Sequence, residues 1–220
     1  MAVSPVLAAA GPTRLNMTHS PKHLLVALAV CAIGALQPTA ASAQDPMAGM
    51  NHGIHIVVPP GAPYVAADVE FMQGMIAHHA QAIVMSRMAE ANGANPRLLK
   101  LANKIDQSQM PEILQMQGWL RYYKQVAPDT SSWRTMTMDG MLNGQQLKEL
   151  EAAKGVEFDR VFLTYMIMHH EGALKMVKDL FAAPRAGQEV DVGIFANDVV
   201  TAQTAEIGVM RQMLAALPPK

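Results

Sequence analysis

Apolar positions along the chain recur with the three- and four-residue steps of helices that bury one face. One stripe in the first such region steps by 3, 4, 3, 4 and 3 residues: Asp68, Phe71, Met75, His78, Ala82 and Met85. This period predicts a helix over about residues 66–92, which the turn-forming sequence ANGANP then interrupts.

Four more helices are predicted, three of them from stripes with the same period. They are predicted at about 96–125, 145–154, 156–183 and 188–216. Pro111 falls inside the second of these, but the apolar stripe continues on both sides of it, which predicts a kink and not an end. No segment alternates between apolar and polar residues as a half-buried strand does. The fold is therefore predicted to be all-α.

Two of the predicted helices carry nearly the same sequence. FMQGMIAHHAQAIVM (71–85) and FLTYMIMHHEGALKM (162–176) are identical at seven of fifteen positions. The helices that follow them share a Gln, Glu and Met at matching steps: Gln109, Glu112 and Met116, then Gln203, Glu206 and Met210. We predict that two duplicated helical hairpins, about 66–125 and 156–216, bury their apolar faces together. They would form a ferritin-like four-helix bundle as a single domain over 66–217.

Residues 1–43 are typical of an export signal preceded by a short extension. Lys22 comes before the apolar run LLVALAVCAIGAL (24–36), and the small residues ASA (41–43) precede an expected cut after Ala43. Thirteen apolar residues are short of the roughly 20 that a membrane span needs. A lipoprotein reading of LAVC is disfavoured because Val30 is not a small residue. We expect a periplasmic protein with no stable membrane insertion after cleavage.

Composition narrows the classes of partner and ligand. Half of the residues are hydrophobic and the net charge is −1, so a sizeable core is expected and a nucleic-acid partner is not. The single cysteine, Cys31, lies inside the signal, so the mature chain would have neither a disulfide nor a thiolate ligand. The chain contains 18 methionines, so any soft-metal chemistry must rest on Met and His.

Adjacent histidines in an apolar helix require an explanation, because an imidazole is costly to bury without partners. Neighbouring residues on a helix diverge by about 100°, so the two rings of each pair point differently within one wide buried face. Two interpretations remain open. Asp68, Asp159 and the two matched glutamates could satisfy the imidazoles within the core, or the imidazoles could bind a metal ion.

Methionines one turn from each histidine pair favour metal binding. The candidate ligands in the bundle combine thioether, imidazole and carboxylate groups: Met75, His78, His79, Met85, Glu112, Met116, Met166, His169, His170, Met176, Glu206 and Met210. Thioether with imidazole suits Cu(I) best, and Ag(I) resembles it. Imidazole with carboxylate could hold Cu(II), Zn or Fe.

Two further segments carry possible ligands outside the predicted helices. Residues 44–65 read as a flexible Met/His arm, whose ligands would be Met47, Met50, His52 and His55. The sequence MTMDGM supplies Met136, Met138 and Met141, which are weaker candidates because they could equally pack a loop against the bundle.

Catalytic patterns are missing from the sequence. A ferritin-like di-iron site places His three residues after Glu, but Gln115 and Val209 stand at those positions here. There is no CxxCH haem motif, no HExxH motif and no Gly-rich phosphate loop. We expect a protein that is not an enzyme.

These motifs resemble the domain-of-unknown-function 305 (DUF305) family, which has the pattern F-x-x-x-M-I-x-H-H-x-x-A-I-x-M and then Q-x-x-E-I-x-x-M. Both repeats match it, with Leu174 in place of the second Ile and Lys175 after it, a cation that would oppose a metal if it turned inward. The resemblance implies an exported four-helix bundle that binds copper in the periplasm and contributes to copper tolerance.

The function expected is periplasmic sequestration or transfer of Cu(I), with metal ions and other copper-handling proteins as partners. In this hypothesis the glutamates are ligands or acceptors that orient an imidazole N–H. A ferritin-like Fe or Mn redox enzyme and a structural bundle with self-satisfied histidines are the alternatives.

Overall fold

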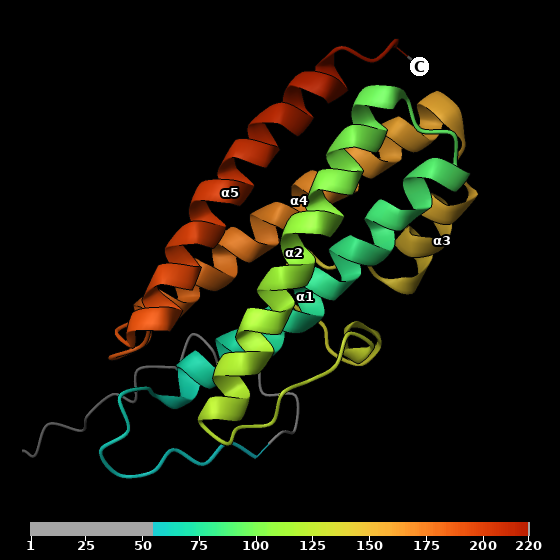
Figure 1. The fold of residues 1–220 in the computed structure, drawn as a ribbon. Coiled ribbons are helices and arrows are strands. Elements are labelled where there is room, and N and C mark those ends of the chain that lie inside the picture. The colour runs from blue at the N-terminus through green and yellow to red at the C-terminus, as the bar shows by residue number, and fades with distance from the viewer. Residues whose placement is uncertain (1–54, 220) are drawn as a thin grey trace, which may run out of the picture. The chain divides into compact units, whose positions relative to one another are not determined.

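Two helical hairpins meet through their first helices in this computed structural model, which describes residues 55–219. The first hairpin pairs α1 (Ala66–Ala91) with α2 (Pro96–Tyr122), and the second pairs α4 (Gly155–Ala182) with α5 (Val190–Ala215) (Figure 1). The described residues contain no strand, so the predicted all-α bundle is confirmed.

The connection between the hairpins contains two short elements, η2 (Ser132–Arg134) and α3 (Gly144–Ala152). The predicted helix ends lie within three residues of those observed, and α2 continues through Pro111 as expected. The 3-10 helix η2 lies between the second and third predicted helices, where the sequence pattern predicted no helix.

Local sequence explains where the helices begin. Asn95 caps α2 by accepting hydrogen bonds from the backbone N–H groups of Arg97 and Leu98, and Pro96 occupies the first turn, where no N–H is needed. Asn143 caps α3 in the same way. Glu189 caps α5 through the N–H of Val192.

Helix α1 is buried on nearly every side, with 19 of its 26 residues inaccessible to solvent. It packs against α2, α4, η2 and α3, which together leave little of its surface free. A helix with this many neighbours is buried on several faces rather than along one stripe. Both histidines of its pair are therefore buried, although they point in different directions.

Buried polar residues of α1 fasten the connection between the hairpins. Gln73 donates to the carbonyl of Val126 at 2.8 Å, and Gln81 both donates to and accepts from the backbone of Leu142. Asn92 donates to carbonyls at the end of α3 and just beyond it. These amides satisfy loop backbone that would otherwise be buried without partners.

The matched aspartates Asp68 and Asp159 tie each hairpin to the turn of the other. Asp68 on α1 accepts from the N–H of Gly187 at 2.6 Å, just before α5. Asp159 on α4 accepts from the N–H and the side-chain amide of Asn95, just before α2. Neither aspartate contacts a histidine, so the suggestion that they satisfy the imidazoles was wrong.

The loop before α3 lies directly on the backbone of α4. Gly140 has φ +80°, which favours glycine, and it packs against Gly172 so closely that a Cβ on Gly172 would lie 2.0 Å from the carbonyl oxygen of Asp139. Lys175 pairs with Asp139 at 2.8 Å and with Asp179 at 2.6 Å. Its side chain is about half exposed and turns outward, so it does not oppose a cation in the core.

The predicted arm is described only from residue 55 onward. His55 is exposed, whereas Ile56, Val58 and Ala62 pack against the core and Tyr64 is buried. Met47, Met50, His52 and the predicted signal lie outside the described residues. Among residues 55–219, no helix has both the length and the apolarity needed to cross a membrane.

We predict that Gly172→Ala lowers the free energy of unfolding by about 2 kcal/mol or more, because the added methyl group displaces the loop at Asp139. Gly208→Ala on α5 is the matched control: a Cβ there meets nothing within 4 Å, so it should stabilise the helix by up to about 1 kcal/mol. Urea denaturation of both variants measures the difference. Equal stabilities would contradict the close packing of the loop.

Candidate metal centre

Four imidazoles form one polar layer across the middle of the bundle. His78 on α1 faces His169 on α4, with ring centroids 3.8 Å apart. Outside this central pair, His79 contacts Glu112 on α2 and His170 contacts Glu206 on α5, each through Nε2 and a carboxylate oxygen at 2.8 Å. The layer therefore runs α2–α1–α4–α5, and the two matched segments contribute equal parts to it.

The polar layer lies between two apolar clusters at opposite ends of the helices. One contains Phe71, Leu120 and Phe195, and the other contains Leu98, Phe158 and Phe162. Burial in this position removes both central histidines from water: His78 is 0% exposed and His169 is 1% exposed. An unsatisfied polar group in such surroundings is costly, at about 1–3 kcal/mol.

Several ring nitrogens in the layer have no hydrogen-bond partner. His169 uses neither Nδ1 nor Nε2, and Nδ1 is unpaired in His78, His79 and His170. His78 Nε2 lies 3.2 Å from the carbonyl oxygen of Asp139 in the overlying loop, which favours the tautomer that donates from Nε2. The layer thus offers imidazole lone pairs that no protein donor occupies.

Burial lowers the pKa of both central histidines. The pKa of His78 falls from 6.5 to about 3, chiefly through desolvation and secondly through its neighbour His79, against a smaller opposing effect of the Asp139 carbonyl. The pKa of His169 is lowered well below its ordinary value, by desolvation first and then by His78 and His170. Both imidazoles are neutral at pH 7, and neutral imidazole is the form that binds metal ions.

The two glutamates of the layer differ in their surroundings. Glu206 is nearly buried, and its second oxygen lies 3.2 Å from the ammonium group of Lys104. Burial alone would raise the pKa of Glu206, but hydrogen bonds from His170 and Lys104 outweigh it and hold the pKa below its ordinary value. The side chain of Glu112 is 28% exposed and pairs with His79.

The predicted thioether ligands divide between the two sides of the polar layer. Met75, Met116 and Met176 belong to the first apolar cluster, and Met85, Met166 and Met210 belong to the second. Each side therefore holds methionines from both hairpins, and all six are buried. In the first cluster, a Cβ on Gly74 would lie 3.3 Å from Met176 Cε.

Met138 joins this first cluster from the loop, where it is buried together with Met136. Its sulfur lies 3.9 Å from where a Cβ on Gly74 would stand, one helical turn before His78. The next loop residue, Asp139, touches His78 directly. The loop thus places a thioether close to the central imidazoles.

No group of three or more His, Cys, Asp or Glu side chains is arranged to hold a metal ion within residues 55–219. The imidazoles of the layer and the thioethers on either side of it are nitrogen and sulfur donors buried next to one another in the core. Such a mixed set of nitrogen and sulfur donors suits a soft cation.

Sequence reasoning found the four histidines, both glutamates and the buried methionines, but it missed two groups at their edge. The Asp139 carbonyl and Lys104 carry no sequence signal, since each reaches the layer from another element. The buried amide oxygens of Gln109 and Gln203 have no partner, and their matched positions one turn before the glutamates could have indicated this.

The fold and the histidine layer define the chain as a helical bundle with a buried imidazole and thioether core. A family profile described as "Domain of unknown function (DUF305)" matches residues 68–214, and the chain belongs to this family. A search of curated proteins found no match.

Solved structures show the same relationship. A putative secreted DUF305 protein from Streptomyces coelicolor is 29% identical, with 68% of this chain and 92% of that chain covered and a TM-score of 0.59. A DUF305 fragment from Deinococcus radiodurans is 28% identical, with 71% and 100% covered and a TM-score of 0.61. CopM in its Cu(I)-bound form is 32% identical, with 66% and 93% covered and a TM-score of 0.53. CopM structures also exist in Cu(II)-bound and Ag-bound forms.

We predict that the metal-free protein loses stability as the pH falls below about 6.5. The unfolded chain protonates His78 and His169 near that pH, whereas the folded chain resists protonation down to about pH 3 at His78. Protonation of each imidazole in the unfolded chain should make the free energy of unfolding at pH 5 lower than at pH 7.5 by up to about 2 kcal/mol. Urea denaturation at pH 7.5 and pH 5 measures this loss. The loss should be much smaller in the double variant His78→Leu/His169→Leu, and an unchanged loss there would contradict the assignment.

Proposed function

We propose that this protein is an exported, non-enzymatic copper-binding protein that sequesters or transfers Cu(I) in copper tolerance. The observation that carries the proposal is the central imidazole pair: His169 is fully buried, faces His78 at 3.8 Å and uses neither ring nitrogen in a hydrogen bond. A purely structural core would gain stability from an apolar side chain there. A metal ligand explains why histidine is present.

The chemistry of the surrounding donors supports a soft cation. Thioethers flank the imidazoles on both sides of the layer, and the chain has no cysteine among the described residues. Met75 and Met166, each three residues before a central histidine, are the nearest candidates on their own helices. Imidazole and thioether together favour Cu(I), with Ag(I) as a close analogue.

The glutamates of the outer pairs orient the histidines that they contact. Glu112 and Glu206 each hold Nε2 of a histidine at 2.8 Å, which fixes the ring orientation and leaves Nδ1 of His79 and His170 unpaired. Carboxylates in this role raise the basicity of the imidazoles they orient. The glutamates thus act as orienting acceptors, and as ligands if a cation moves outward.

The family and its solved members add independent support. CopM, 32% identical, has been solved with Cu(I), Cu(II) and Ag, and the Streptomyces coelicolor relative is described as a putative secreted protein. The predicted signal over residues 1–43 agrees with export to the periplasm. In the proposed function, Met47, Met50, His52 and His55 of the arm capture the ion or hand it on.

Of the two alternative functions, the structural bundle, whose histidines are satisfied by hydrogen bonds within the core, has specific support from the structure. The hydrogen bonds of His79 to Glu112 and of His170 to Glu206 are those that a purely structural role would require. That interpretation accounts for the outer pairs but leaves His169 unexplained.

We predict opposite effects of His169→Leu on stability and on copper binding. Removing an unsatisfied buried imidazole should raise the stability of the metal-free protein by about 1–3 kcal/mol, while Cu(I) affinity falls at least about a hundredfold. Anaerobic titration against a chromophoric Cu(I) chelator and urea denaturation measure the two quantities. A loss of stability with unchanged Cu(I) affinity would support the structural alternative.

The control for this experiment replaces the four arm ligands, Met47, Met50, His52 and His55, with serine in the same protein. Cu(I) binding should persist in that variant if the bundle holds the ion. Loss of all binding would instead assign the copper to the arm and overturn the proposed centre.

We also predict that Met138→Leu weakens Cu(I) binding without unfolding the protein. Leucine fills the buried space, but it removes the sulfur that lies near Gly74, one helical turn before His78. The affinity should fall about tenfold in the chelator titration. Met213→Leu, a buried methionine near the far end of α5, is the matched control and should leave affinity unchanged. Equal affinities in both variants would exclude the loop thioether as a ligand.

A further inference from the structure

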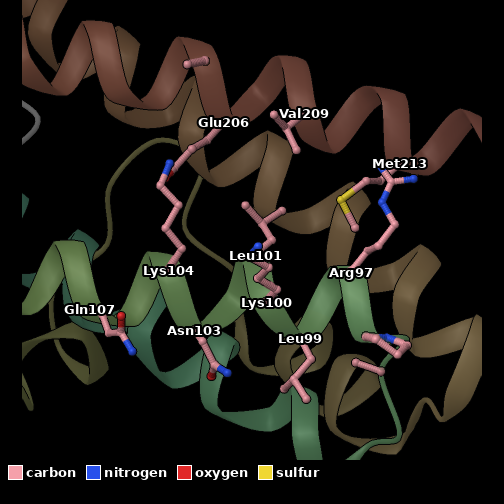
Figure 2. Close-up of a pocket in the computed structure, with 13 residues that line it drawn as sticks. Arg97, Leu99, Lys100, Leu101, Asn103, Lys104, Gln107, Glu206, Val209 and Met213 are labelled. Atoms are coloured by element: carbon pink, nitrogen blue, oxygen red, sulfur yellow. The ribbon is translucent and has the colours of Figure 1, made fainter.

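A groove of about 900 Å³ runs between α2 and α5 and opens to solvent beside the polar layer. Its walls combine apolar side chains with the basic residues Arg97, Lys100 and Lys104, and Glu206 lies on its α5 side. Figure 2 shows Lys104 reaching across from α2 toward Glu206. The groove therefore gives solvent a route to the carboxylate that holds His170.

Both oxygens of Glu206 are engaged. One accepts from His170 at 2.8 Å inside the core, and the other pairs with the ammonium group of Lys104 at 3.2 Å on the groove side. The Glu206 side chain is 5% exposed, whereas that of Lys104 is 66% exposed. The carboxylate is thus fixed in the core, and its charge is balanced by a cation that can leave toward solvent.

The other half of the layer lacks this arrangement. Glu112 holds His79 at the same 2.8 Å, but no lysine or arginine of residues 55–219 pairs with it. In the sequence register that matches Glu112 to Glu206, Lys104 corresponds to Asp198. The duplicated framework therefore carries opposite charges at corresponding positions of its two hairpins.

We propose that Lys104 is a built-in counter-ion that makes the two halves of the layer unequal toward a metal cation. This inference rests on the proposed function and extends it to the order of binding. At His79–Glu112 the carboxylate charge is free to attract the cation, so that half binds first. At His170–Glu206 the cation must displace the ammonium group of Lys104, so that half binds more weakly and releases its ion more easily.

Two charges of the same sign close to one carboxylate repel each other, which is the physical basis of the inequality. Lys104 leaves the groove at low energetic cost, since most of its side chain is already in water. The positive charge of Lys104 therefore opposes the arrival of a Cu(I) ion at the imidazole that Glu206 holds.

The test removes the outer histidine of one half at a time and leaves the central pair His78–His169 in place. His79→Leu leaves the His170–Glu206 half, and His170→Leu leaves the His79–Glu112 half; Lys104→Gln is then added to each. The full-length mature protein is titrated anaerobically with Cu(I) against a chromophoric chelator. Lys100→Gln, which removes a second groove lysine that makes no ion pair with Glu206, is the matched control.

We expect Lys104→Gln to tighten Cu(I) binding about threefold to tenfold in the His79→Leu background and to leave the His170→Leu background unchanged. Lys100→Gln should change neither. Equal tightening by Lys104→Gln in both backgrounds, or equal tightening by Lys100→Gln, would overturn the specific role of Lys104. So would no change in either background. If the unsubstituted protein does not bind Cu(I), the proposed function itself fails, whereas binding there and in neither background would overturn the division of the layer into two halves.

Discussion

The bundle depends on placing four imidazoles in the middle of an apolar core. A buried polar group without a hydrogen-bond partner is costly, and neither ring nitrogen of His169 has such a partner. The fold confines the penalty to one layer, with an apolar cluster packed on each side of it and a glutamate at each outer edge. The aspartates that begin the same stripes lie far from this layer and hold the hairpins together at their ends. Stability and the polar layer are thus assigned to different residues of one repeated pattern.

The connection between the hairpins completes the layer. A bundle of two hairpins alone would leave one side of α1 open, but residues 123–154 cover it and are fastened to α1 by Gln73, Gln81 and Asn92. This cover brings the Asp139 carbonyl to His78 and a thioether to the turn before it. The Gly140–Gly172 contact and the Lys175–Asp139 ion pair hold the cover on α4. The surroundings of the central histidines therefore depend on a segment that has no counterpart in the second hairpin.

Much of this arrangement could be predicted from the sequence because helical periodicity reports which residues share a buried face. The steps of three and four residues placed the four long helices, and the matched His and Glu positions indicated the layer. Periodicity does not report which element lies opposite a given face. It therefore could not show that Asp68 reaches the turn at Gly187, or that Lys104 reaches Glu206. Contacts of that kind depend on turn geometry and on how the hairpins pack, which short-range patterns do not contain.

The duplication also explains why the two halves of the layer can differ without damage to the fold. The residues of the layer recur at matching buried positions of both hairpins, and each hairpin holds its outer His and Glu at 2.8 Å. Lys104 and Asp198 lie on exposed surfaces, where a change of charge has little effect on packing. A charge at such a position still acts on a nearby buried carboxylate, because the interior screens it less than water does. Electrostatics at the edge can thus distinguish two His–Glu pairs that share the same 2.8 Å contact.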